Sequence, residues 1–272
     1  MLSDEQTRLL AVCVLALVGL ALAIATVRTY QHFRFTPLQF PLYMYNLFMT
    51  RVIWRVAVEG RLSLPLDQGA VIVCNHRSPI DPAFVALACD RQVHWMVARE
   101  YCKHPLVGWA LKILQVIPTG RGGIDTASTK LAIRYAQQGD LVGMFPEGRI
   151  NDTSRLMLPG RPGVAFVALK TRVPVVPCYI SGSPFDGNVF SFLFITAKTR
   201  LRVGRPIELG EYYGREGDRE VLEELTRRFL CEIARLAGVP DYVPELAGKR
   251  PRPGAPPDVA LEPVADKAKS VP

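Results

Sequence analysis

The chain of 272 residues is long enough for one large α/β domain with appended segments, and its 49% hydrophobic and 21% charged content favours a folded protein over a disordered one. A formal net charge of +8 at pH 7 indicates anionic partners. The basic residues are scattered and form no zinc-finger or RNA-recognition pattern, so we expect a membrane surface or a phosphorylated substrate and no nucleic acid.

The first predicted element is a membrane helix. Leu9–Val27 is an uncharged apolar run of 19 residues, about 28 Å long as a helix and close to the hydrocarbon thickness of a bilayer. A signal peptide is the competing interpretation, but the leader carries two acids (Asp4 and Glu5) against Arg8, and the run is longer than the usual signal core. We therefore predict a retained anchor at residues 1–30, which either spans the membrane or lies in its surface.

The next segment, residues 31–55, combines aromatic and basic side chains and predicts an amphipathic helix at the membrane interface. An ordinary core helix is the alternative, and both can hold for different faces. No acid occurs between the anchor and Glu59. The bias toward basic residues places the rest of the chain on the cytoplasmic side of the cell membrane. These basic residues are Arg28, Arg34, Arg51 and Arg55.

Residues 56–247 alternate short β-rich runs with helical stretches, which predicts an α/β fold with a layered mixed sheet flanked by helices. The predicted strands are Val56–Val58, Ala70–Cys74, Val93–Ala98, Leu141–Phe145, Val173–Ile180 and Arg200–Val203. The predicted helices are Pro82–Cys89, Pro105–Leu114, Thr126–Gln138, Gly163–Thr171 and Arg219–Leu236, with Asp125 and Asp218 as N-caps. The Pro-rich residues 248–272, with a basic start, predict a disordered tail.

A histidine and an aspartate five positions apart, His76 and Asp81, follow the apolar run Ala70–Cys74. Neither a helix nor a strand brings side chains at this spacing together, whereas a turn ahead of a helix beginning near Pro82 can do so. The pair then has the composition of a histidine base oriented by a carboxylate. The alternatives are a structural histidine and an aspartate that only caps the helix.

Six cysteines without a CxxC pair indicate free, buried thiols and no metal site or disulfide framework. A nucleophilic role for Cys74, two residues before His76, is conceivable, but core packing suits a cysteine in an apolar run better. The cysteines are Cys13, Cys74, Cys89, Cys102, Cys178 and Cys231.

Two further loops carry candidate binding residues. Arg121 lies in a Gly-Arg-Gly-Gly loop before a helix, where its guanidinium and free backbone N–H groups can hold a phosphate. Glu147, Gly148 and Arg149 follow a predicted strand end, the place where ligands of α/β sheets collect. A solvated loop and a plain β-turn are the respective alternatives.

Four blocks in this order resemble the glycerolipid acyltransferases typified by 1-acylglycerol-3-phosphate acyltransferase. The first block is the His-x4-Asp pattern of Asn75–Asp81, and the others are Ile117–Arg121, Phe145–Gly148 and Val173–Pro177. The segment from Arg99 to Trp109 is similar to the family's linker between the first two blocks. The resemblance covers roughly Val56 to Glu208 and implies a fold like that of glycerol-3-phosphate acyltransferase.

The resemblance implies transfer of a fatty acyl group to 1-acylglycerol 3-phosphate, forming phosphatidate in phospholipid biosynthesis. It implies His76 and Asp81 as catalytic residues, Arg121 in binding the acceptor phosphate, and Glu147 and Gly148 in acceptor binding or site organisation, while Arg149 is a further basic candidate for substrate binding. No cofactor is expected; acyl-CoA or acyl carrier protein serves as co-substrate, and the other partners are membrane lipids and the lysophospholipid acceptor.

Two positions depart from the family pattern on the acceptor side. Gly120 stands where an acid commonly precedes the arginine, and Arg149 directly follows Gly148 without the usual Thr or Ser. A lyso-ornithine lipid or lysophosphatidylcholine therefore remains an alternative acceptor. Other classes left open are a non-catalytic lipid-binding module and a serine hydrolase using Ser78, although the chain has no Gly-x-Ser-x-Gly elbow.

Overall fold

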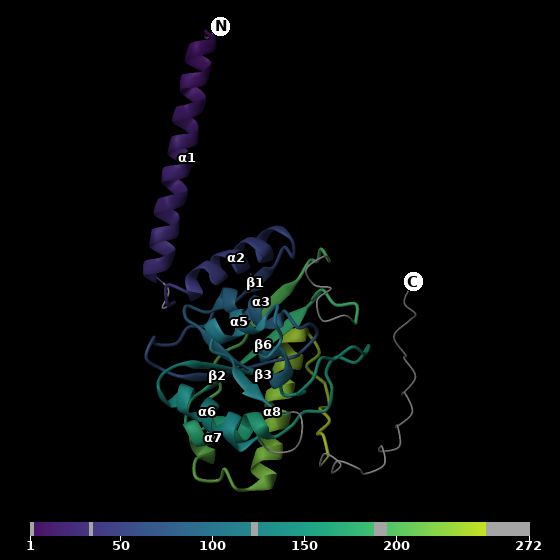
Figure 1. Cartoon of the computed structure of the whole chain (residues 1–272). Helices are drawn as coiled ribbons and strands as arrows, with labels where there is room; N and C mark the ends of the chain where they lie inside the picture. The colour runs from purple at the N-terminus through teal and green to yellow at the C-terminus, as the bar shows by residue number, and fades with distance from the viewer. Residues whose placement is uncertain (1–2, 33–34, 121–124, 188–194, 249–272) are drawn as a thin grey trace, which may run out of the picture.

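The computed structural model describes residues 3–32, 35–120, 125–187 and 195–248, and it shows a long helix, α1, rising from a layered body (Figure 1). The helices are α1 (Asp4–His32), α2 (Gln39–Val52), α3 (Asp81–Val85), α4 (Arg99–Cys102), α5 (Gly108–Ile113), α6 (Thr126–Gln137), α7 (Gly163–Thr171) and α8 (Arg219–Ala237), with 3₁₀ turns η1 (Ala86–Ala88) and η3 (Gly210–Tyr212). The strands are β1 (Ala57–Glu59), β2 (Ala70–Cys74), β3 (Val93–Ala98), β4 (Ile117–Thr119), β5 (Leu141–Met144), β6 (Val175–Ser181) and β7 (Arg200–Val203).

The strands form one sheet in the order β1-β7-β6-β2-β5-β3-β4. Neighbouring strands are parallel except β6 and β7, which are antiparallel. The expectation of a mixed sheet flanked by helices is therefore confirmed. Because β2, β3, β4, β5 and β6 run in the same direction, their carboxyl ends share one edge of the sheet, where ligands of α/β proteins bind.

Side chains of the central strand β2 alternate between two cores, as the period of a strand requires. Val71 and Val73 belong to the core on one face, and Ile72 and Cys74 to the core on the other. Both faces are buried, which explains why β2 reads as an uninterrupted apolar run.

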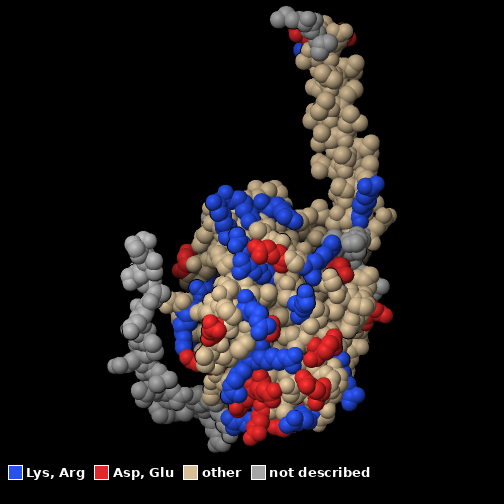
Figure 2. Space-filling model, turned by 180° about the vertical axis from the view of Figure 1, so that it is seen from behind, with Lys and Arg blue, Asp and Glu red and all other residues tan. Residues whose placement is uncertain are grey.

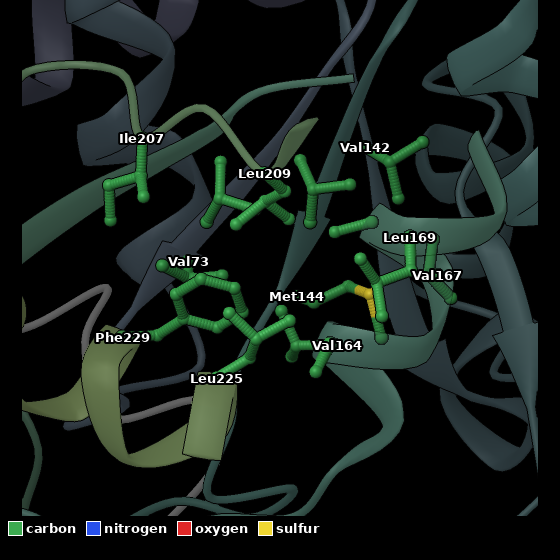
Figure 3. Packing of buried hydrophobic residues seen from close by; sticks show 14 of the residues in the cluster. Val73, Val142, Met144, Val164, Val167, Leu169, Ile207, Leu209, Leu225 and Phe229 are labelled. Carbon is green, nitrogen blue, oxygen red and sulfur yellow. The ribbon is translucent and has the colours of Figure 1, made fainter. Parts of the chain in front are cut away.

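Helices α6, α7 and α8 cover the first face. Phe229 and Leu225 of α8 and Val164 of α7 meet Val73 and Met144 from the sheet (Figure 3). Phe229 and Leu225 are fully buried, so each contributes roughly 1.5–3 kcal/mol through apolar burial. The apolar stripe of α8 that was visible in the sequence is this contact.

The predicted caps of two helices are confirmed. The Asp125 carboxylate accepts the backbone N–H of Ser128 at the start of α6. Asp218 accepts the N–H groups of Glu220 and Val221 at the start of α8, which ends at Gly238 with a left-handed φ of 87°. Each cap satisfies donors that have no partner inside the helix.

Some elements differ from the prediction. β4 was not predicted as a strand, because it is three residues long and has Pro118 in its middle, where strand signals fail. The single turn α4 was also missed. The helix predicted for Pro82–Cys89 is α3 followed by η1, and Cys89 is already extended. The helix predicted from Pro105 begins only at Gly108.

The N-terminal helix α1 is long and apolar enough to cross a bilayer, and its apolar stretch makes no buried contact with the body. At its C-terminal end, Tyr30 meets Phe40 of α2 edge to face, with ring centroids 5.0 Å apart. Helix α2 buries Tyr43 and Met49 on one side and exposes Tyr45 and Phe48 on another. The predicted tail from residue 249 onward lies outside the described residues.

Candidate active site

The carboxyl end of β2 brings His76 and Asp81 together. His76 Nδ1 and Asp81 Oδ2 lie 3.0 Å apart; the Asp81 side chain is fully buried, and 15% of the His76 side chain is exposed. The alternative of a helix-capping aspartate does not hold, because the N-cap of α3 is Ile80, and the Asp81 carboxylate is directed back to the preceding loop. This geometry leaves Nε2 as the ring nitrogen that is not engaged by the carboxylate.

The Asp81 carboxylate is held by three further donors. Its Oδ2 accepts the backbone N–H groups of Arg77 at 2.6 Å and Ser78 at 2.8 Å. Its Oδ1 accepts the Ser183 hydroxyl at 2.7 Å. Because backbone N–H groups only donate, the shared oxygen acts as an acceptor, and the proton between it and the imidazole belongs on Nδ1. The pair therefore presents Nε2 as a base.

The face of the imidazole is fixed by two aromatic rings. Phe145 stacks on His76 with centroids 3.7 Å apart and an interplanar angle of 6°. Trp95 stacks on the same phenylalanine, with centroids 4.6 Å apart and planes at 22°. Trp95 needs the space left by Gly143, where an added Cβ would lie 2.3 Å from the indole. The ring of His76 is thus positioned by both a carboxylate at its edge and an aromatic stack at its face.

Glu147 joins two loops at the site. Its side chain is buried; Oε1 accepts the His76 N–H at 2.7 Å, and Oε2 accepts the Leu158 N–H at 2.7 Å. Burial raises the pKa of Glu147 to about 7, against the lowering effect of these two backbone hydrogen bonds. Both carboxylate oxygens accept backbone N–H groups of this chain. The Glu147 side chain therefore links the loop of His76 to the segment of Leu158.

The other predicted binding residues are placed differently. Gly148 adopts a φ of 69°, a left-handed conformation that favours glycine, and its N–H donates to the Phe145 carbonyl in a tight turn. Arg149 follows it and is exposed. Arg121 lies outside the described residues, so its position relative to His76 is not part of this geometry.

The loop that carries His76 is braced by residues that sequence reasoning missed. The buried Asn75 side chain makes two hydrogen bonds to the backbone of Ile180, at 2.9 and 2.7 Å. The N–H of Asn151 donates to the His76 carbonyl at 2.7 Å. With Ser183, these contacts come from segments far along the chain, and no short motif links them. Only the strand end before Asn75 gave a signal that this loop lies at the sheet edge.

Two alternative nucleophiles are engaged in the core. Cys74 is fully buried, and burial raises the pKa of its thiol well above the usual value. Ser78 is buried, and its hydroxyl donates to the Pro184 carbonyl at 2.6 Å. Neither side chain is available to attack a substrate, and the described residues contain no cluster of His, Cys, Asp or Glu suited to a metal ion.

An open pocket of about 390 Å³ lies beside the His76–Asp81 pair, within the size range of small-molecule sites. Asn151 and Ser183, which contact this pair, are part of its wall. The lining residues are Arg77, Asn151, Asp152, Gly182, Ser183, Phe185, Asp186 and Gly187.

Comparison with known proteins points to one class of enzyme. Residues 55–181 match the family model described as Acyltransferase. The chain is 28% identical over 158 residues to the 1-acyl-sn-glycerol-3-phosphate acyltransferase of Bacillus subtilis, covering 58% of this chain and 76% of that protein. It is 31% identical over 137 residues to the enzyme of the same name from Limnanthes alba, covering 48% of each chain.

A solved structure has a similar fold. The 1-acyl-sn-glycerophosphate acyltransferase PlsC from Thermotoga maritima superposes with a TM-score of 0.54, covering 70% of this chain and 78% of that chain. At 24% identity this likeness supports the fold. It agrees with the layered sheet and its flanking helices described above.

Proposed function

We propose that this chain, which belongs to the glycerolipid acyltransferase family and is an acyltransferase, moves a fatty acyl group from a thioester donor to 1-acylglycerol 3-phosphate and so forms phosphatidate. The observation that carries the proposal is the 3.0 Å contact between His76 Nδ1 and the buried Asp81 carboxylate. The donor is acyl-CoA or acyl carrier protein, and the chemistry needs no further cofactor.

The proposed reaction uses His76 as a general base. Nε2 takes the proton of the acceptor hydroxyl while the acceptor oxygen attacks the thioester carbonyl. The new C–O bond forms, the C–S bond breaks, and the thiolate of the donor leaves and takes up the proton from His76. Asp81 holds the imidazole in the required tautomer and stabilises the imidazolium that forms in between.

Acceptor recognition is assigned to two arginines of the sequence motifs. We propose that Arg121 binds the acceptor phosphate and that the exposed Arg149 contributes, because arginine pairs with phosphate through two parallel hydrogen bonds. Glu147 and Gly148 shape the loop that precedes Arg149, and Glu147 acts through its hydrogen bond to the backbone of His76. The pocket beside Ser183 offers space for a further part of either substrate.

We also propose that the enzyme acts at the cell membrane. The apolar helix α1 has the length of a membrane-spanning segment, and its shaft is free of charge between its ends (Figure 2). Arg28 and Arg51 on the side of the body favour a cytoplasmic catalytic domain. An amphiphilic acceptor would then reach His76 from the bilayer.

The test is a donor-by-acceptor matrix with the purified full chain, read out as release of free thiol. We expect turnover with a long-chain acyl thioester and 1-acylglycerol 3-phosphate, and its loss by several orders of magnitude in His76→Ala and Asp81→Asn. His104→Ala, a histidine outside the site, is the control. Full turnover in His76→Ala would overturn the catalytic assignment.

The same matrix decides the acceptor. Arg121→Ala should impair acceptors that carry a phosphate monoester more than a lyso-ornithine lipid or lysophosphatidylcholine. Faster turnover of one of those two acceptors in the wild-type chain would replace 1-acylglycerol 3-phosphate, while leaving the acyl transfer itself intact.

A further inference from the structure

A second pocket, of about 360 Å³, lies between the turn that follows α2 and the segment that leads into β7. Its volume is within the range of sites that hold small ligands. The residues that line it are Arg55, Ala57, Ser181, Lys198, Thr199 and Arg200. Three of the six are cationic, and they come from two parts of the chain that are far apart in sequence.

Backbone hydrogen bonds hold these two parts together. The N–H of Thr199 donates to the Trp54 carbonyl at 3.2 Å, and the N–H of Ala57 donates to the Thr199 carbonyl at 2.9 Å. Between these bonds, Arg55 adopts a φ of +39°, in the left-handed region. Such a conformation costs a non-glycine residue on the order of 1 kcal/mol. These bonds fix the wall of the pocket, and Arg55 stands there at a position where glycine or asparagine would be less strained.

The charges around the pocket are not balanced. Arg200 Nε and Arg202 Nε both contact the single carboxylate of Glu59, at 3.1 and 2.8 Å. One acid thus serves two arginines. Arg55 and Lys198 are exposed and form no ion pair within the described ranges. A pocket with this excess of cationic donors suits a phosphate group, which accepts several charge-assisted hydrogen bonds at once.

The location of the pocket ties it to both the site and the membrane side. Ser181 ends β6, which runs parallel to β2, so the pocket lies at the same sheet edge as the loop of His76. The turn containing Arg55 follows α2, at the end of the body from which α1 rises (Figure 1). Lys and Arg side chains gather over part of this end of the body when it is seen from behind (Figure 2).

We infer that the pocket formed by Arg55, Lys198 and Arg200 binds the phosphate of an anionic phospholipid of the bilayer. This contact holds the sheet edge that carries the His76 loop at the membrane surface. The inference rests on the proposed membrane location and is independent of which acceptor His76 serves. It assigns Lys198 and Arg200, which are far in sequence from the predicted interfacial segment, to membrane contact.

The test counts lipids bound to the full chain in a neutral detergent by native mass spectrometry. Phosphatidylglycerol and phosphatidylcholine are titrated separately, and a third series adds inorganic phosphate as competitor. The variant is Arg55→Asn/Lys198→Gln/Arg200→Gln, in which asparagine tolerates the left-handed backbone. The matched control is Lys130→Gln/Arg134→Gln/Arg205→Gln, which removes three exposed charges of the same sign elsewhere.

We expect the variant to bind phosphatidylglycerol about tenfold more weakly or worse, with phosphatidylcholine binding unchanged and the control variant equal to wild type. Competition by inorganic phosphate alone would identify the phosphate group as the part recognised. An equal loss of phosphatidylglycerol binding in the variant and the control would overturn the inference, because net charge alone would then explain the loss. A loss of thiol release in detergent that parallels the loss of lipid binding would assign the pocket to the acceptor and overturn it as well.

Discussion

The phenyl ring of Phe145 lies parallel to the imidazole of His76, with centroids 3.7 Å apart and planes at 6°. Asp81 contacts the edge of the same imidazole at Nδ1. The carboxylate limits rotation of the ring within its plane, and the stack limits tilting out of that plane. Because Phe145 and Glu147 are two residues apart, one short segment positions both the ring and the backbone of His76.

Gly143→Ala should disturb this stack from a distance. The new Cβ would lie 2.3 Å from the Trp95 indole, so Trp95 must move and Phe145 with it. We expect a loss of about 1–3 kcal/mol in the free energy of unfolding and a kcat lowered about tenfold or more through misplacement of His76. Urea unfolding and steady-state kinetics check both values.

Gly163→Ala is the control for that substitution. A Cβ at this first residue of α7 meets no atom within 4 Å. We expect unchanged kcat and a stability equal to wild type or higher by up to about 1 kcal/mol, since alanine favours the helix. If both variants lost kcat to the same extent, transmission through Trp95 would be excluded.

Ser183→Ala should lower kcat while leaving KM for the donor nearly unchanged, because the hydroxyl donates to Asp81 Oδ1 and is proposed to act through that carboxylate. The lost hydrogen bond is worth about 1 kcal/mol, which corresponds to roughly a fivefold to tenfold effect if it acts fully on the transition state. Ser183→Thr retains the hydroxyl and should restore most of the rate. Failure of threonine to rescue would indicate a packing role instead.

Glu147→Gln should destabilise the contact between the His76 loop and the segment of Leu158. The glutamine amide offers one oxygen and one donor group, so one of the two N–H groups, of His76 or Leu158, loses its acceptor. An unsatisfied buried N–H costs about 1–3 kcal/mol. We expect lower stability in urea unfolding and a lower kcat in steady-state assays at pH 8.

The stability difference between the wild type and Glu147→Gln should depend on pH, because the pKa of Glu147 is raised to about 7 from an ordinary value of 4.5. Between these values the folded chain keeps a proton that the unfolded chain has released. The contribution of the protonated carboxyl to stability is therefore full below about 4.5 and is lost as the pH rises through about 7. Wild-type stability minus that of Glu147→Gln should fall from pH 5 to pH 7.5; parallel curves would contradict the raised pKa.

Cys74→Ala should retain acyltransferase activity within about twofold, since the buried thiol takes no part in the proposed direct transfer. Removing one sulfur from a packed core should cost about 1 kcal/mol or more of stability. A thiol reagent applied to the native chain should spare Cys74, because burial raises its pKa well above the usual value. Loss of turnover without loss of fold would revive a cysteine nucleophile.

The sequence predicted the elements that carry a strong local signal. Uninterrupted apolar runs predicted β2 and β5, because both faces of these strands are buried. The helical spacing of apolar residues predicted α8, because one stripe of that helix is buried. β4 and α4 were missed, since three or four residues are too few to show a period. Their structure depends on pairing with β3 and packing beside it.

The candidate site was predictable where the residues are close in sequence. His76, Asp81 and the Phe145–Gly148 segment each stand in a short motif. No role was predicted for Ser183, Asn75 or Trp95, because their roles arise only when strands distant in sequence become neighbours. The roles of Arg121 and Arg149 stay predictions until the acceptor assays are done.

The bracing of the His76 loop also sets an order of events during synthesis. Its partners, among them Leu158 through Glu147, Ile180 and Ser183, all leave the ribosome after His76 itself. Helix α1, at the start of the chain, emerges before any of them. Chains fold from the N-terminus as they are made. The apolar helix thus emerges while the histidine still lacks its supports, and the Asp81 carboxylate receives its last described donor only after the chain has passed residue 183.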